Sequence, residues 1–178
     1  MKYLVFSDVH GSAFYLNKIL TIFKEENFEK AIFLGDAIYH GPGNDLPYGY
    51  DHKKTIDLFN ELSKNIIAIK GNCDCEADQS KLDFDISTSN KILKLNNHQV
   101  LLTHGHHLEV DKKIACDIIL HGHTHIKELC YKEDGKLYLC PGSISICRDD
   151  TLSYAILDEI SFTTFNLLDK KMISKICF

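Results

Sequence analysis

A histidine-rich turn in the third quarter of the chain carries the most distinctive chemistry of the sequence. An apolar run at 118–120, typical of a buried strand, is followed directly by His121-Gly122-His123-Thr124-His125. Two imidazoles with one residue between them, placed at a strand end, can turn toward one point outside the sheet. Imidazole is the commonest protein ligand for Mn, Fe, Zn, Cu and Ni. His123 and His125 are therefore candidate metal ligands.

Four other strand-end loops also finish in side chains that bind metals. They contribute Asp8 and His10, Asp36, Asn72, and His104. With the histidine turn, this set offers the carboxylate and imidazole ligands that two divalent ions need, and Asp36 is the natural bridge because a carboxylate can bind both ions at once. Asn72 would bind through its carbonyl oxygen and would add no charge.

Two divalent ions held by these residues would make a site suited to phosphate esters. Asp8 and Asp36 are the only charged ligands, so the site would keep a net charge of about +2 and attract a phosphate without any arginine. Two ions about 3.5–4 Å apart lower the pKa of a shared water and stabilise the charge of an in-line displacement. The predicted reaction is phosphoester hydrolysis by a metal-bound hydroxide, with Asp36 and Asn72 among the catalytic residues.

The elements that must position these loops alternate over the first seventy residues. Apolar runs at 2–7, 31–34 and 65–70 predict strands, and helical spacing of apolar residues predicts helices after Ser12 and over 52–63. This order predicts a parallel sheet with right-handed crossovers, whose ligands bind at the carboxyl ends of the strands. The second half predicts hairpins over 91–103 and 128–140, then strands at 153–157, 162–167 and 172–177. We expect an α/β fold in which two sheets pack face to face with helices outside.

Composition narrows the class of protein. The chain has 178 residues, of which 44% are hydrophobic and 25% charged, which predicts one globular domain over residues 1–178. The net charge of −5 gives no basic surface, so we expect no stable nucleic-acid complex and disfavour a nuclease. No segment has the length of a membrane span, so no membrane association is expected. The seven cysteines, without zinc-finger spacing or a secretory leader, indicate reduced thiols in the cytoplasm.

The five strand-end motifs together resemble a known signature, that of the calcineurin-like metallophosphoesterases. The motifs are Asp8-x-His10, Gly35-Asp36, Gly71-Asn72, His104 and Gly122-His123-x-His125, in the family order. Within that superfamily the chain is similar to the small bacterial YfcE-type phosphodiesterases. Three further stretches carry this closer likeness: Gly71-Asn72-Cys73-Asp74, the loop from His40 to Tyr50, and Pro141-Gly142-Ser143-Ile144-Ser145-Ile146.

The resemblance implies a fold, a set of ligands and a class of substrate. The fold is a four-layer α-β-β-α sandwich of two mixed sheets, and the substrate is a small phosphodiester. The implied ligands of one metal are Asp8, His10, Asp36 and His125, and those of the other are Asp36, Asn72, His104 and His123. Mn²⁺ is the ion that such enzymes most often use, with Fe, Ni or Zn as alternatives. A homodimer or homotetramer is the implied assembly.

One departure from the wider family concerns the group that protonates the leaving oxygen. Many members have a histidine directly after the motif asparagine, where this chain has Cys73. A thiol is a poor acid for an alkoxide, so monoester hydrolysis should be weak, whereas diesters with good leaving groups need less help. YfcE-type enzymes share this cysteine and are regarded as diesterases. His106 is the candidate substitute acid, while Cys73 and Asp74 are expected near the ligands or the substrate rather than on a metal.

An alternative function from another class is a protein-interaction scaffold. The retromer subunit that shares this fold is regarded as mainly such a platform, and fold alone does not separate the two functions. Scaffolds of this kind lose ligands from the histidine motifs, whereas all seven are intact here. The enzyme is therefore the favoured interpretation. The loop over 39–51, long and rich in tyrosine, is expected to form a substrate wall or a subunit contact.

Overall fold

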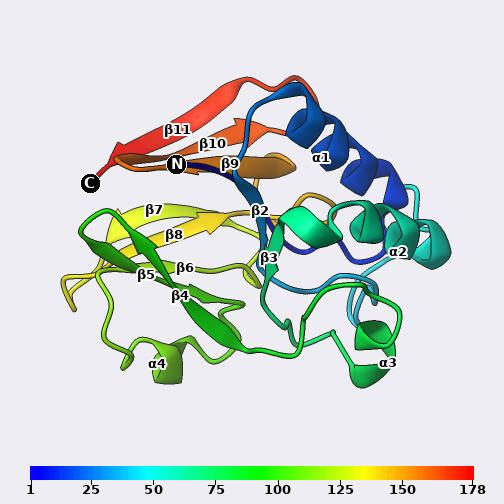
Figure 1. Cartoon of the computed structure of the whole chain (residues 1–178), viewed down its shortest axis with the longest axis horizontal. Helices are drawn as coiled ribbons and strands as arrows, with labels where there is room; N and C mark the ends of the chain where they lie inside the picture. Colours follow the sequence, from blue (N-terminus) through cyan, green and yellow to red (C-terminus); the bar gives the residue numbers. More distant parts are fainter.

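Two mixed β-sheets lie face to face at the centre of the computed structural model, which describes residues 1–178 (Figure 1). The six-stranded sheet has the order β11 (Met172–Cys177), β10 (Ser161–Asn166), β9 (Ser153–Asp158), β1 (Lys2–Phe6), β2 (Lys30–Phe33) and β3 (Ile66–Ala68). The five-stranded sheet has the order β4 (Asn90–Leu95), β5 (His98–Thr103), β6 (Ile118–Leu120), β8 (Leu137–Pro141) and β7 (Lys127–Tyr131). The predicted pair of sheets is confirmed.

Each sheet contains three adjacent parallel strands, whose carboxyl ends lie at the same edge of the sandwich. In the six-stranded sheet β1, β2 and β3 pair in parallel, as the strand and helix alternation predicted. In the five-stranded sheet β5, β6 and β8 are parallel, while β4 and β7 join as antiparallel hairpin partners. Each predicted ligand follows one of the strands β1, β2, β3, β5 or β6. The topology therefore gathers all five motifs at one edge of the sandwich.

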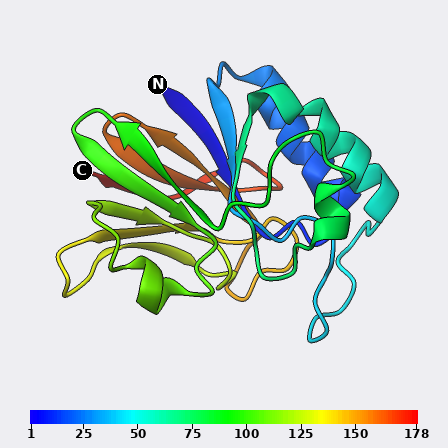
Figure 2. The same cartoon turned by 60° about the horizontal axis from the view of Figure 1, so that its bottom comes forward.

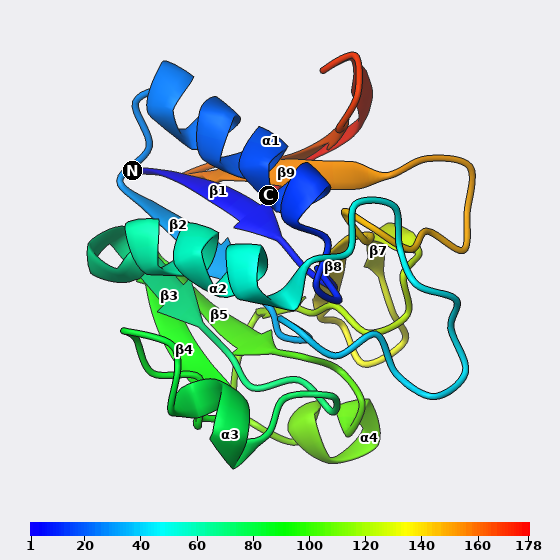
Figure 3. The same cartoon turned by 90° about the vertical axis from the view of Figure 1, so that its right-hand side faces the viewer.

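Two helices cover the outer face of the six-stranded sheet (Figure 3). Helix α1 (Ala13–Glu25) begins at Ser12, whose hydroxyl accepts a hydrogen bond from Tyr15 N, and it buries Leu16 and Ile19. Helix α2 (His52–Glu61) begins at Asp51, whose carboxylate caps the Lys54 N–H. The buried faces of both helices join the sheet in one apolar cluster of 22 residues.

A second apolar cluster of 15 residues fills the space between the sheets. Val5 and Ile32 enter it from the six-stranded sheet, and Val100, Leu102 and Leu120 enter it from the five-stranded sheet. Successive strand residues point to opposite faces, so alternate positions fill this inner core while their neighbours pack outward. The two sheets are thus joined by continuous apolar contact, which fixes the loops of one sheet against those of the other.

The fourth layer of the sandwich is thin. On the outer face of the five-stranded sheet, Leu101, Ile119 and Tyr138 pack against Leu108 and Ile114 around the short helix α4 (Leu108–Asp111). Helix α3 (Glu76–Gln79) and the 3₁₀ turn η1 (Ser63–Asn65) are equally short. Elements of three or four residues leave no periodic pattern, so the sequence did not predict them.

The loop over 39–51, cyan in Figure 2, projects from the body of the molecule. No helix combines the length and apolar composition needed to cross a membrane.

Candidate metal centre

Left-handed backbone marks the loops that carry the predicted ligands. Seven non-glycine residues have positive φ, and five of them are predicted ligands: Asp8 (57°), His10 (48°), Asp36 (63°), His123 (67°) and His125 (59°). This region is sparsely populated by residues with a Cβ, and each such residue costs about 1 kcal/mol or more in strain. The surrounding contacts therefore hold these turns in conformations that they would not adopt unaided.

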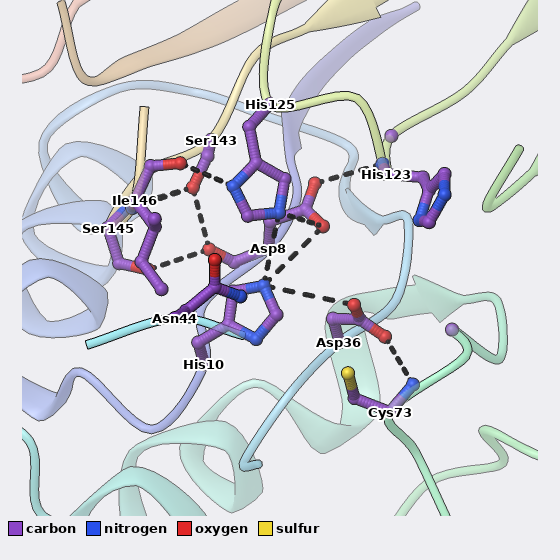
Figure 4. Close-up of polar contacts among 12 residues, drawn as sticks. Asp8, His10, Asp36, Asn44, Cys73, His123, His125, Ser143, Ser145 and Ile146 are labelled. Atoms are coloured by element: carbon purple, nitrogen blue, oxygen red, sulfur yellow. Dashed lines mark hydrogen bonds and ion pairs between the residues drawn. The ribbon is translucent and has the colours of Figure 1, made fainter. Parts of the chain in front are cut away.

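Asp8, His10 and His125 converge on one point at the end of β1 (Figure 4). The two imidazole Nε2 atoms lie 3.2 Å apart, and His125 Nε2 lies 3.3 Å from Asp8 Oδ1. On the far side of each ring, His10 Nδ1 donates to the Tyr39 carbonyl at 2.8 Å, and His125 Nδ1 donates to the Ile146 carbonyl. A carbonyl only accepts, so each Nδ1 carries the proton and each neutral ring turns an Nε2 lone pair inward.

These inward lone pairs fit a cation. Two unprotonated nitrogens 3.2 Å apart repel each other unless a positive charge lies between them. Asp8 Oδ1 is buried beside them and has no hydrogen-bond partner. Although burial alone would raise it, the neighbouring imidazoles of His125, His104 and His10 hold the pKa of Asp8 well below its ordinary value. An ionised carboxylate and two imidazole nitrogens, each oriented by a carbonyl behind it, make a donor set that a divalent ion satisfies.

Asp36 lies between this group and a second one. Its Oδ2 is 3.8 Å from His10 Nε2 on one side and 3.4 Å from His104 Nε2 on the other. His104 Nδ1 donates to the Leu34 carbonyl at 2.7 Å, which again turns Nε2 inward, and Asn72 Oδ1 lies 2.9 Å from that nitrogen. One oxygen of Asp36 therefore faces imidazole nitrogens of both groups.

His123 stands slightly apart from the other predicted ligands. Its backbone N–H donates to Asp8 Oδ2 at 3.2 Å, and its ring centroid lies 5.1 Å from that of His104. The ring forms no ion pair with Asp8 or Asp36. The structure thus brings six of the seven predicted ligands into direct polar contact and places the seventh ring beside His104.

The two candidate acids lie beside different ligands of this centre. The Cys73 sulfur is grouped with the ligand atoms of His10 and Asp36, and burial together with the Asp36 carboxylate raises the pKa of the thiol to about 12. The His106 ring lies 5.4 Å from His104 and 6.1 Å from His123, measured between centroids. Burial and the neighbouring His104 lower the pKa of His106.

Asp74 ties two ligand loops together from behind. Its Oδ2 accepts hydrogen bonds from Asp36 N (2.9 Å) and Gly71 N (2.8 Å), and its Oδ1 accepts one from Ala37 N (2.8 Å). Burial raises the pKa of Asp74 to about 6 although these three bonds lower it, so the carboxylate is ionised at neutral pH. The loop after β2 and the loop after β3 are therefore fixed relative to each other through one side chain.

Two serines that sequence reasoning did not assign a role hold the Asp8 turn. The hydroxyls of Ser143 and Ser145 both donate to the Asp8 carbonyl, at 2.9 and 2.8 Å. The next residue, Ile146, supplies the carbonyl that orients His125. Their role could have been predicted from their positions, because two serines at i and i+2 shortly after β8 lie at the same sheet edge as the ligand motifs.

The first residue of the histidine turn points away from the metal centre. His121 is buried, and its Nε2 lies 2.9 Å from Glu128 Oε2, while its Nδ1 lies 3.1 Å from the Gly122 carbonyl. The Glu128 carboxylate also pairs with Lys132 at 2.9 Å. His121 therefore anchors the turn to β7 and leaves ligation to the residues that follow it.

Metal binding is expected to release a proton from His104. Burial lowers its pKa, but the Asp36 and Asp8 carboxylates outweigh this effect and raise the pKa to about 9, so the metal-free ring is protonated at pH 7. Because a ligand nitrogen must be unprotonated, the apparent Mn²⁺ affinity should rise with pH until about 9. Calorimetric titration in two buffers of different ionisation enthalpy should show the release of about one proton per protein at pH 7. Equal affinities at pH 6.5 and pH 8.5 would contradict this assignment.

The approach of the β3 loop to Asp36 leaves no room for a side chain at Gly71. A Cβ there would lie 2.1 Å from Asp36 Oδ1 and 2.4 Å from Asp36 N. Both atoms are held by hydrogen bonds, so Gly71→Ala should displace the carboxylate, abolish metal binding and destabilise the fold by about 1–3 kcal/mol. Gly43→Ala is the matched control, because its Cβ would meet nothing within 4 Å. The test is to measure the metal content and thermal unfolding of both variants. Equal metal content in the two variants would show that a side chain at position 71 does not displace Asp36.

Known proteins of similar sequence point to one family. The family model of the calcineurin-like phosphoesterase superfamily domain matches residues 1–161. The chain is 33% identical to phosphodiesterase YfcE of Escherichia coli strain K12 over 181 residues, which cover 99% of this chain and 97% of the relative. It is 31% identical to phosphodiesterase MJ0936 of Methanocaldococcus jannaschii, covering 80% of this chain and 83% of the relative.

Solved structures agree with this assignment. The structure of YfcE, a phosphoesterase from E. coli, superimposes with a TM-score of 0.92 at 32% identity and covers 99% of both chains. Vps29 of Entamoeba histolytica in complex with Zn²⁺ superimposes with a TM-score of 0.69 at 20% identity over 99% of both chains, which shows a shared fold alone. The resemblance inferred from the motifs is confirmed, and the four-layer sandwich with it. The chain belongs to the calcineurin-like phosphoesterase superfamily.

Proposed function

We propose that this protein is a metal-dependent phosphodiesterase that hydrolyses a small phosphodiester. The observation that carries the proposal is the position of Asp36, one of whose oxygens faces imidazole nitrogens of both ligand groups. The inward lone pairs of His10 and His125 and the unpartnered Asp8 oxygen support a cation position between them rather than a structural hydrogen-bond network. The names of the YfcE and MJ0936 relatives support the choice of diesters as substrates.

Two divalent ions would be held by the residues at the sheet edge. One ion would take Asp8, His10, Asp36 and His125, and the other would take Asp36, Asn72, His104 and His123. When bound, the ions would supply a water nucleophile that is ionised at neutral pH and positive charge for the phosphoryl oxygens. Mn²⁺ is the proposed ion, with Fe, Ni or Zn as alternatives.

Hydrogen bonds with other groups of the protein would hold the imidazole rings and the Asp36 carboxylate in the orientation needed to bind metal. The carbonyls of Leu34, Tyr39 and Ile146 hold ring protons on Nδ1 and turn each Nε2 inward; the Nε2 of His104 would bind after releasing its own proton. Asp36 would be kept in its bridging position by the Cys73 N–H, which donates to its Oδ1 at 2.8 Å. This preorganisation lets metal binding proceed without rearrangement of the loops.

The proton donor available to the leaving group determines which esters the proposed site would hydrolyse well. The Cys73 thiol, with its pKa raised to about 12, is a poor proton donor at neutral pH. His106, beside His104 and His123, is the proposed donor in its place. Diesters with acidic leaving groups should therefore be turned over well, and monoesters poorly.

The test compares two aryl esters with the same leaving group. After removal of metal by a chelator, neither bis(p-nitrophenyl) phosphate nor p-nitrophenyl phosphate should be hydrolysed. Added Mn²⁺ should restore hydrolysis of the diester, with kcat/KM at least about tenfold above that of the monoester. Absence of turnover on both esters, with metal bound and the protein folded, would remove the enzyme proposal and favour the interaction scaffold.

Several wider properties form part of the same proposal. Residues 1–178 would act as one catalytic domain, supported by the apolar cluster that joins both sheets. The seven free cysteines support a reducing compartment, and we place the protein in the cytoplasm. A dimer or tetramer is proposed by analogy with the family, and no stable nucleic-acid complex is expected at a net charge of −5.

A further inference from the structure

A polar cavity of about 290 Å³ opens beside the metal centre. No hydrophobic side chain lines it; the lining residues are Lys70, Gly71, Asn72, Asp74, Ser89, His106 and His107. Asn72 belongs to both places, since its Oδ1 lies 2.9 Å from His104 Nε2. A molecule whose phosphorus occupies the metal centre can therefore extend one of its arms into this cavity.

The charges of the cavity lining, those of Lys70 and Asp74, sum to zero, but only the positive one is free to meet a ligand. The half-buried Lys70 forms no ion pair within the chain, so its ammonium is free to meet a ligand. Asp74 is the only carboxylate in the lining, and both of its oxygens already accept backbone N–H groups from Asp36, Ala37 and Gly71. The unpaired charge that a ligand encounters is consequently that of the lysine.

Two histidines add hydrogen-bonding capacity beside this lysine. The rings of His106 and His107 lie 4.2 Å apart between centroids, and His106 Nδ1 is buried without a hydrogen-bond partner. Because that nitrogen is closed to solvent, the hydrogen bond to a ligand falls to the exposed His107 ring, which also borders the cavity. The exposed Ser89 hydroxyl offers a further donor on the same lining.

The lining also limits the kind of group that fits. No hydrophobic side chain lines the cavity, and its only rings are the two imidazoles, so a large apolar group would find little wall to pack against. Its volume lies just below the range of about 300–1,000 Å³ that holds whole drug-sized ligands. A small, strongly polar group matches both constraints.

We propose that this cavity is an anion subsite, and that the natural substrate is a phosphodiester with a second anionic group, a carboxylate or a phosphate, on one arm. Lys70 supplies the charge, and Ser89 and His107 supply hydrogen bonds. The substrate class stated here rests on the proposed phosphodiesterase function. The subsite itself is specified by the cavity lining alone.

A matched pair of synthetic diesters tests the substrate class. Ethyl p-nitrophenyl phosphate and 2-carboxyethyl p-nitrophenyl phosphate share the leaving group and differ by one carboxylate. With Mn²⁺ present, the carboxyethyl diester should have at least about tenfold higher kcat/KM, because its carboxylate can accept a charge-assisted hydrogen bond from Lys70. Lys70→Gln should reduce this ratio of kcat/KM values about tenfold. Lys171→Gln, at an exposed lysine that pairs with Asp169 and does not line the cavity, should leave the ratio as it is in the wild type.

A binding measurement separates the subsite from catalysis. In metal-free protein, titration with inorganic phosphate should shift the imidazole NMR signals of His106 and His107 in a saturable way, and Lys70→Gln should remove the response. If both diesters are hydrolysed with nearly equal kcat/KM and Lys70→Gln does not change the ratio of these values, the subsite is overturned and the proposed phosphodiesterase function is retained. A phosphate response without hydrolysis of either diester would overturn the phosphodiesterase and retain the subsite.

Discussion

An Asp36→Asn variant is expected to lose at least about a thousandfold in kcat/KM toward bis(p-nitrophenyl) phosphate, equivalent to about 4 kcal/mol of transition-state free energy. The reason is position and charge: Asp36 Oδ2 lies 3.4 Å from His104 Nε2 and 3.8 Å from His10 Nε2, between the two ligand groups. Asparagine keeps the shape and can still accept the Cys73 N–H, but it lacks the charge that holds a bridge between two cations. The measurement is steady-state kinetics together with metal content.

The control for this variant lies in the neighbouring loop. Asp45→Asn removes the same charge from an exposed residue, so it should keep full metal content and activity. Thermal unfolding of metal-free Asp36→Asn should stay close to that of the metal-free parent, which separates loss of metal from loss of fold. Retention of two metal equivalents and near-normal turnover in Asp36→Asn would exclude the bridging role.

Replacing Asp74 with alanine is expected to lower the free energy of unfolding by about 3–5 kcal/mol. The change would leave three buried N–H groups, those of Asp36, Ala37 and Gly71, without acceptors. For a chain of this size the melting temperature should fall by about 10 °C or more. Because the loops after β2 and β3 would no longer be tied together, metal affinity should also fall about 10–100-fold.

Urea unfolding and Mn²⁺ titration measure these two effects. Asp57→Ala is a suitable control, since this exposed aspartate on α2 makes no side-chain hydrogen bond and alanine favours the helix. A loss of stability no larger in Asp74→Ala than in Asp57→Ala would show that solvent satisfies the three N–H groups. An unchanged metal affinity in an otherwise destabilised Asp74→Ala would show that the ligand loops are fixed by other contacts.

Most of the fold could be predicted from local patterns. Apolar runs and turn residues located the strands, and the alternation of strands with helices predicted the parallel arrangement of β1, β2 and β3. Pairings between distant segments left no local trace. The strand β9 inserts beside β1 with Val5 opposite Ala155, and β6 lies between the parallel strands β5 and β8. Such neighbours are chosen by core packing across the whole chain rather than by any one segment.

In the candidate site, too, some features could be predicted from local sequence and others depend on distant segments. The types of its side chains were readable, because carboxylates and imidazoles after buried strands are rare unless they meet at a sheet edge. The groups that orient them were not readable, since the carbonyls of Leu34 and Tyr39 look like any others in sequence. The hydroxyls of Ser143 and Ser145 gain their role only because β8 brings them to the Asp8 turn. The metal-ligand assignments themselves remain predictions until metal content is measured.

The left-handed backbone at the ligand positions sets stability and function against each other. Glycine adopts such angles freely, so a glycine in place of His10 or His125 would relieve strain at the same position where it deletes a ligand. Selection for thermal stability in metal-free medium should therefore enrich inactive glycine variants at these turns. In medium rich in Mn²⁺ the preference should reverse, because an ion that binds only the native state stabilises the parent in proportion to the logarithm of its concentration. Metal supply would then decide which sequence is the more stable one.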